Sequence, residues 1–141
     1  GAKNTKMRFE VTEKDGVTFI NDAYNASPLS MKAALKTMAE TYGGRKIAVL
    51  GDMLELGDAE FAAHKKVGEE VKEFNFAALI TLGERGKIIA DGAKNAGLEN
   101  IIVTSTHKEA AEALKSILQK GDAVLLKGSR GMEMEKILGL V

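Results

Sequence analysis

The sequence predicts an α/β fold in which helices cover both faces of a doubly wound six-stranded sheet. Two observations lead to this prediction. Short apolar runs alternate along the chain with longer amphipathic runs, the order typical of parallel strands joined by right-handed helical crossovers. Near the N-terminus, Asp15-Gly16 separates two runs of alternating character, which indicates a hairpin. The sheet is therefore expected to be mostly parallel, with one antiparallel edge strand from the hairpin.

The expected elements follow this order along the chain. The hairpin strands are expected at 7–13 and 17–22. Four further runs are uniformly apolar, as in strands covered on both faces, at 45–52, 77–83, 100–105 and 122–128. Helical patterns occupy 28–41, 59–74, 84–97, 107–119 and 130–139. Ser27 and Pro28 suit the N-cap and first turn of the first helix, and Asp58 suits the N-cap of the second. Residues 1–141 are expected to form one domain.

Composition excludes several classes of function. Lys plus Arg and Asp plus Glu both number 20, so the formal net charge is zero and nothing indicates nucleic acid or an anionic membrane as a partner. The chain has no cysteine, which excludes a disulfide framework and a Cys nucleophile and fits a reducing cytoplasm. No run approaches a spanning helix or a signal peptide. Because the chain opens on Gly1-Ala2 rather than Met, we expect it to be part of a longer protein.

The motifs that are missing are also informative. The chain has no G-x-x-x-x-G-K-[ST] phosphate loop, no G-x-G-x-x-G after a strand and no G-x-S-x-G nucleophile elbow. A complete NTPase, dinucleotide dehydrogenase or α/β-hydrolase is therefore not expected.

Polar residues gather at the predicted strand ends, where open α/β sheets bind their ligands. Asp22 ends the second strand, and its carboxylate suits either nearby backbone amides or the hydroxyls of a ribose; the sequence leaves both open. Ser27 and Pro28 are explained by helix capping, but Tyr24 and Asn25 are not. Asp22, Tyr24 and Asn25 are therefore candidates for part of a nucleotide site.

A second group lies where the last predicted strand ends. Lys127 and Arg130 flank Gly128-Ser129 at a junction between a strand and a helix, which suits a carboxylate or a phosphate. Arg130 could bind a carboxylate with two parallel hydrogen bonds. The alternative is a surface ion pair between Arg130 and Glu133 or Glu135, which would contribute about 0–1 kcal/mol.

A third group contains the acids Asp52, Glu55 and Asp58, followed by His64 in the next helix. Such a set could bind Mg²⁺, but it lacks the spacing of a metal motif, so no metal site is predicted here. Glu84, in the loop after the next strand, is by default a solvated residue.

Three motifs, in this order, closely resemble the C-terminal domain of the Mur ligases: INDAYNASPLSMKAAL (20–35), GDMLELG (51–57) followed by His64, and LLKGSRGMEME (125–135). The forms of the first and last motifs are similar to those of the branch that adds D-alanyl-D-alanine to a UDP-N-acetylmuramoyl tripeptide. One departure is Ser27, where the family usually carries Asn; both residue types cap helices.

The resemblance implies a Rossmann-like domain that closes over ATP in an ATP-dependent peptide ligase of peptidoglycan synthesis. Its partners would be an N-terminal UDP-substrate domain and a central ATPase domain, which would supply the phosphate loop and the Mg²⁺ ligands. It implies that Asp22 contacts the ATP ribose, with Tyr24 and Asn25 near the nucleotide. Ser129 and Arg130, with Lys127 beside them and Glu84 on a neighbouring loop, would hold D-Ala-D-Ala. A cytoplasmic monomer that is inactive without its other domains is expected.

Two other classes of function remain open on the residues alone. A phosphoacceptor receiver domain carries Asp, Thr and Lys at its strand ends, and similar residues occur here at Asp22, Asp52, Thr81 and Lys127. Receivers, however, carry a paired acid at the first strand and Pro after the Lys. A free-standing nucleotide-binding module is the other alternative, and it requires ATP affinity in the chain by itself.

Overall fold

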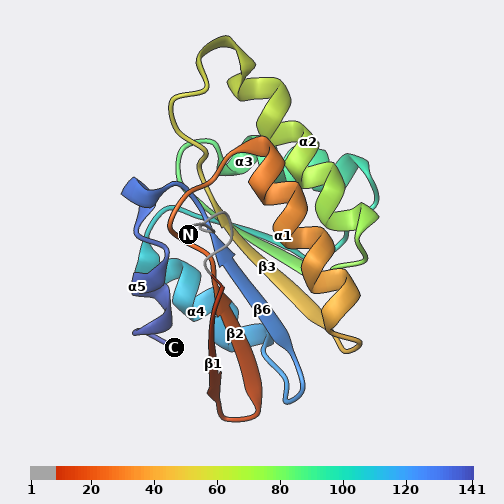
Figure 1. The fold of residues 1–141 in the computed structure, drawn as a ribbon, viewed down its shortest axis with the longest axis vertical. Helices are drawn as coiled ribbons and strands as arrows, with labels where there is room; N and C mark the ends of the chain where they lie inside the picture. Colours follow the sequence, from red (N-terminus) through yellow and green to blue (C-terminus); the bar gives the residue numbers. More distant parts are fainter. Residues whose placement is uncertain (1–8) are drawn as a thin grey trace, which may run out of the picture.

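One sheet of six strands, in the order β1-β2-β6-β3-β4-β5, crosses the middle of the molecule (Figure 1). The structure is a computed structural model, and it describes residues 9–141. The strands are β1 (Glu10–Lys14), β2 (Val17–Asn21), β3 (Lys46–Gly51), β4 (Ala78–Leu82), β5 (Ile101–Thr104) and β6 (Ala123–Lys127). β1 pairs antiparallel with β2, and every other neighbouring pair is parallel. The predicted fold class is confirmed; residues 7 and 8 of the first predicted strand lie outside the described residues.

Helices cover both faces of this sheet. They are α1 (Pro28–Thr41), α2 (Glu60–Glu73), α3 (Gly86–Asn95), α4 (His107–Ile117) and α5 (Glu135–Leu138), with short 3-10 turns η1 (Gly57–Ala59) and η2 (Arg130–Met132). Residues of α1, α2 and α3 pack together on one face, and residues of α4 and α5 pack on the other. Figure 1 shows these two layers on opposite sides of the strands. β6 is the last strand along the chain, but it lies between β2 and β3. After β5, at the far edge, the chain therefore returns across the sheet to form β6 beside β3.

The first helix starts as its sequence predicts. The Ser27 hydroxyl accepts a hydrogen bond from the Ser30 N–H at 3.1 Å, and the Ser30 hydroxyl accepts one from the Ser27 N–H at 2.9 Å. This reciprocal pair, followed by Pro28 in the first turn, satisfies N–H groups that a helix leaves unpaired. Of the helices in residues 9–141, none combines the length and the apolar character that crossing a membrane would require.

Three predicted elements differ from the structure. The helix expected at 130–139 is interrupted: η2 ends at Met132, Glu133 is left-handed at φ 51°, and only α5 follows. Asp58 is not an N-cap, because it lies within η1 and α2 begins after Ala59 with no side-chain cap. β5 is not covered on both faces either. It is an edge strand, and Val103 is half exposed.

Candidate functional site at the carboxyl edge of the sheet

The carboxyl ends of the five parallel strands meet at one edge of the sheet, as the sequence predicts. Loops after β3 and β6 touch there, because the Ser129 N–H donates to the Asp52 carbonyl at 2.8 Å. The Asp22 N–H likewise donates to the Leu126 carbonyl at 2.9 Å, which extends the ladder between β2 and β6. The residues singled out after β2, β3 and β6 are therefore neighbours in space.

Asp22 and Lys127 form a buried ion pair beneath this edge. The Lys127 ammonium lies 2.8 Å from the Asp22 carboxylate, and both side chains are almost fully enclosed. The same ammonium donates to the Asn25 carbonyl at 2.8 Å. Lys127 thus neutralises Asp22 and holds the loop that carries Tyr24. In this arrangement neither charged group faces solvent, so direct ligand contacts of Asp22 and Lys127 remain predictions.

Arg130 and Tyr24 lie together above this buried pair. The guanidinium carbon is 5.0 Å from the centre of the Tyr24 ring, a cation–π contact between the loops after β2 and β6. Both residues are exposed. Arg130 makes no ion pair within residues 9–141, whereas Glu133 pairs with Lys136 at 2.9 Å. Among the described residues, no surface carboxylate neutralises Arg130, so the predicted alternative of a surface ion pair is not observed. The edge of the guanidinium is therefore available to an anion.

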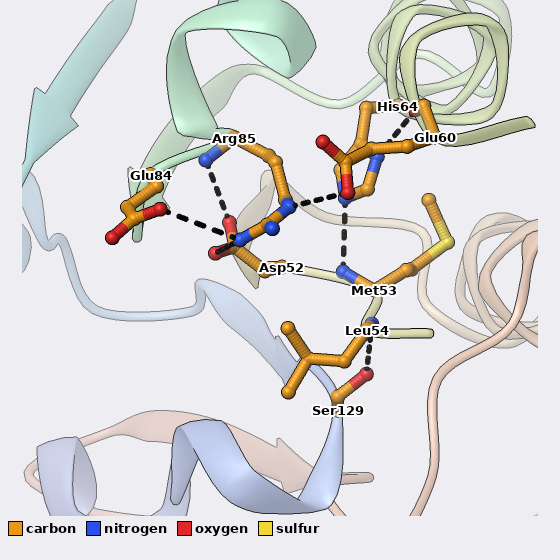
Figure 2. A network of polar contacts seen from close by, with 8 residues as sticks. All are labelled: Asp52, Met53, Leu54, Glu60, His64, Glu84, Arg85 and Ser129. Atoms are coloured by element: carbon orange, nitrogen blue, oxygen red, sulfur yellow. Dashed lines mark hydrogen bonds and ion pairs between the residues drawn. The ribbon is translucent and has the colours of Figure 1, made fainter. Parts of the chain in front are cut away.

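The segment Asp52–Leu54, which we call the β3 strap, connects Ser129 to the neighbouring loops (Figure 2). The Leu54 N–H donates to the Ser129 hydroxyl at 2.7 Å. The Met53 N–H donates to His64 Nε2 at 2.9 Å. Ser129, predicted to contact a substrate, is thus held in place by main-chain groups of the strap, and its hydroxyl hydrogen remains available for another acceptor.

His64 is a structural residue in this arrangement. Its ring is completely buried in α2, and Nδ1 lies 2.7 Å from the Glu60 carbonyl. Since Nε2 accepts from Met53, the hydrogen of the neutral ring is on Nδ1, where it donates to Glu60. Both ring nitrogens are therefore used inside the protein, and neither is free to act as a base.

Asp52 anchors the loop after β4. Its carboxylate accepts from the Arg85 N–H at 3.0 Å and from the Arg85 guanidinium at 3.1 Å. Arg85 also lies 2.8 Å from the Glu60 carboxylate, and its contacts with Glu60 and then Asp52 raise the pKa of Arg85 above its usual value. Glu84, the neighbour of Arg85, is 90% exposed, and its carboxylate lies 3.8 Å from the Arg85 guanidinium (Figure 2). Its predicted contact with a substrate remains a prediction.

The acids and the histidine of the third group do not come together. Asp52 binds Arg85 and His64 binds main-chain groups, while Glu55 adopts a left-handed conformation at φ 63° in the exposed loop before η1. Within residues 9–141, no group of three or more His, Cys, Asp or Glu side chains could hold a metal ion.

The sequence did not reveal the connections among Asp52, Arg85, Glu60 and His64. One signal was present in the sequence: a glycine, Gly83, comes directly before Glu84-Arg85. In the structure Gly83 has φ 120°, a conformation that favours glycine. A Cβ atom at Gly83 would lie 2.6 Å from the Asp52 carboxylate, so this glycine allows Asp52 to reach Arg85. Gly51 and Gly128 instead accommodate Met134, which would lie 2.7 and 2.9 Å from a Cβ added at these positions.

The fold defines a Rossmann-like domain, and its candidate functional site lies at the carboxyl edge of the sheet. The chain belongs to the Mur ligase family: the sequence model of the Mur ligase, glutamate ligase domain matches residues 7–130. This membership does not support the receiver alternative.

Its relatives include the UDP-N-acetylmuramoyl-tripeptide–D-alanyl-D-alanine ligase of Bacillus subtilis, with 43% identity over 98% of this chain and 31% of the relative. The MurF ligase of Thermotoga maritima, solved in complex with ADP, superposes with a TM-score of 0.76 at 30% identity, covering 99% of this chain and 31% of that one. MurF of Acinetobacter baumannii gives a TM-score of 0.83 at 29% identity, with coverages of 98% and 31%. The chain thus spans less than a third of the length of these relatives.

Proposed function

We propose that this chain is the C-terminal domain of an ATP-dependent ligase that adds D-Ala-D-Ala to UDP-MurNAc-tripeptide in peptidoglycan precursor synthesis. Family membership and the names of the relatives support the reaction class. The domain would act with a central ATPase domain and an N-terminal UDP-substrate domain. Its lack of a phosphate loop, and of a metal-binding cluster in residues 9–141, supports the proposal that other domains bind Mg²⁺ and the phosphates.

The observation that carries the proposal is the Arg130 guanidinium, which lies over the Tyr24 ring and makes no ion pair within residues 9–141. Its position at the carboxyl edge is where open α/β sheets bind ligands, and a guanidinium recognises a carboxylate through two parallel hydrogen bonds. We assign the dipeptide carboxylate to Arg130, with the Ser129 hydroxyl as a further donor and Glu84 at the rim. Lys127 would support this site from below by holding Asp22 and the Asn25 carbonyl.

Tyr24 and Asn25 are our candidates for ATP contacts. Both are exposed in the loop between β2 and α1. Asp22, in contrast, is 1% exposed and bound to Lys127, so this conformation does not leave its carboxylate open to a ribose. We propose that Asp22 orients the Tyr24-Asn25 loop, and that any direct ribose contact requires this loop to move. Closure of the domain over ATP would exclude water from the reacting groups.

The test uses the full-length ligase and measures ATP-dependent phosphate release with UDP-MurNAc-tripeptide and D-Ala-D-Ala. Arg130→Ala is expected to raise the KM for the dipeptide by about 10- to 100-fold, because a charge-assisted hydrogen-bonded pair is lost. The KM for ATP should change little. Lys94→Ala is the matched control: it also removes one positive charge, from the exposed C-terminal end of α3, and should leave both values unchanged.

Two outcomes would contradict the proposal. A ligase that releases no phosphate with these substrates would contradict the reaction class. An unchanged dipeptide KM in Arg130→Ala would contradict the assigned role of Arg130. The isolated chain should show no phosphate release, and ATP affinity comparable to that of the full-length protein would instead favour a free-standing nucleotide-binding module.

A further inference from the structure

The η2 turn, which begins with Arg130, is closed by its own main-chain hydrogen bonds. The Met132 N–H donates to the Ser129 carbonyl at 2.8 Å, and the Glu133 N–H donates to the Arg130 carbonyl at 3.1 Å. Glu133, which follows the turn, is left-handed at φ 51°, a conformation that residues other than glycine keep only where their surroundings hold them. Two contacts from outside the turn act here, one on Met134 and one on Met132.

The contact on the C-terminal side of the turn is made by the Met134 side chain, which is completely buried. Cβ atoms added at Gly51 and Gly128 would lie 2.7 and 2.9 Å from this side chain, so the two glycines provide the room that it occupies. Met134 belongs to the same apolar cluster as Ala110 of α4, on the face of the sheet that α4 and α5 cover (Figure 1). This side of the turn is therefore anchored against the core.

The contact at Met132 is made by His107, the first residue of α4. His107 Nε2 lies 2.8 Å from the Met132 carbonyl. Because a carbonyl oxygen only accepts, Nε2 carries the hydrogen of the ring and donates it. The two residues are 25 positions apart, so this half-buried bond joins the start of α4 to the segment that follows β6.

The position of His107 is fixed because the start of α4 is capped. The Thr106 hydroxyl accepts from the Glu109 N–H at 3.0 Å, and the Glu109 carboxylate accepts from the Ser105 N–H at 2.8 Å. These two bonds define where the helix begins. Ala110, buried in the next turn, packs the helix onto the sheet. The imidazole therefore reaches η2 from a well-ordered helix rather than from a loop.

We propose that His107 is a positioning residue for Arg130: its hydrogen bond to the Met132 carbonyl sets the conformation of η2 and thereby the direction of the guanidinium. His107 itself touches no substrate. The inference rests on the proposed function, in which Arg130 binds the dipeptide carboxylate. It adds that α4, which carries none of the predicted site residues, controls how well Arg130 makes this contact.

The experiment measures kcat and the KM values for D-Ala-D-Ala and ATP in the full-length ligase. His107→Phe keeps a ring at this position and removes the donor. It is expected to raise the dipeptide KM about 3- to 10-fold, the range that corresponds to one lost hydrogen bond, and to leave the KM for ATP unchanged. His107→Gln, whose side-chain amide can donate to the same carbonyl, should restore the dipeptide KM to within about 2-fold of the wild type.

Combination with Arg130→Ala separates positioning from a general structural role. If His107 acts through Arg130, His107→Phe should raise the dipeptide KM no further in the Arg130→Ala background. General damage to the domain would instead impair both backgrounds by the same factor. Lys108→Ala is the control, since it replaces the exposed neighbour of His107 on the same helix, and it should leave all three values unchanged.

The two proposals fail in different ways. If Arg130→Ala raises the dipeptide KM but His107→Phe does not, the positioning role is wrong and the proposed function stands. The same conclusion follows if His107→Phe acts equally in both backgrounds, or if His107→Gln behaves like His107→Phe. If Arg130→Ala leaves the dipeptide KM unchanged, or if the full-length ligase does not use D-Ala-D-Ala, both proposals are overturned.

Discussion

The Lys127 ammonium lies 2.8 Å from the Asp22 carboxylate in an environment from which water is almost completely excluded. The two residues are 105 positions apart, and they join the end of β2 to the end of β6. Lys127 also holds the Asn25 carbonyl. This pair therefore fixes, from inside the sheet edge, the two loops that carry Tyr24 and Arg130.

Removing one partner of this pair should be costly. Asp22→Asn or Lys127→Met leaves the other charge buried and uncompensated, which typically costs about 3–5 kcal/mol. The double variant should lose less than the sum of the two single variants, because neither charge then remains. Urea unfolding of the chain measures these differences. Lys136→Met, a replacement of an exposed lysine, is the control and should change stability little; single-variant losses below about 1 kcal/mol would contradict the buried pair.

The β3 strap should depend on His64. His64→Ala removes the acceptor of the Met53 N–H and empties a buried space, so we expect a loss of about 2–4 kcal/mol in the free energy of unfolding. NMR should show shifted amide signals for Met53 and Leu54, and through Leu54 for Ser129. His107→Ala is the comparison, since that ring is only half-buried and contacts the Met132 carbonyl. Unchanged signals at Leu54 would show that the strap does not need His64.

Gly83 should tolerate no side chain. Gly83→Ala must accept φ 120° and a Cβ 2.6 Å from the Asp52 carboxylate, so we expect a loss of at least about 1–3 kcal/mol. The contact between Asp52 and Arg85 should weaken at the same time. Gly43→Ala is the control, because nothing lies within 4 Å of its added Cβ, and its stability should stay equal or rise slightly. Thermal unfolding of both variants measures these effects. Equal melting temperatures for Gly83→Ala and Gly43→Ala would contradict the prediction, because the loop would then rearrange without strain.

Acid should weaken the opposite edge of the sheet through Asp122. Burial favours the neutral form of this carboxyl, but hydrogen bonds from Arg45 at 2.9 and 2.8 Å and from the Gln119 N–H at 2.8 Å outweigh burial and lower the pKa of Asp122. Because the folded-state pKa is depressed, the unfolded state binds the proton more readily. The stabilisation is therefore complete above about pH 4 and is lost as the pH falls through the folded-state pKa.

Asp122→Asn isolates this contribution. At pH 7 the variant should be about 1–3 kcal/mol less stable than the wild type, since hydrogen bonds to a charged group are lost. The difference should shrink as the pH is lowered below about 4, where the wild-type carboxyl becomes protonated too. Urea unfolding at several pH values measures it; a difference independent of pH would contradict the assignment.

The sequence predicted the sheet and most of its helices because these depend on local patterns. The alternation of apolar and amphipathic runs, the Asp15-Gly16 turn and the Ser27-Pro28 cap each act within a few residues. The interruption near Glu133 was not predictable in this way. Met134 packs into the core against Gly51 and Gly128, and a continuous helix from 130 to 139 does not form in the structure.

Which side chains are exposed at this edge was likewise decided by the tertiary structure. The sequence by itself determined the fold class, the family resemblance and the edge of the sheet where polar residues gather, since strand direction and strand order bring those ends together. Only the tertiary structure distinguished the environments of the two cations: Lys127 is buried against Asp22, whereas Arg130 is exposed and contacts the Tyr24 ring. The physical reason is that burial and pairing depend on contacts between loops far apart in the sequence. Two cations three positions apart therefore end in different environments.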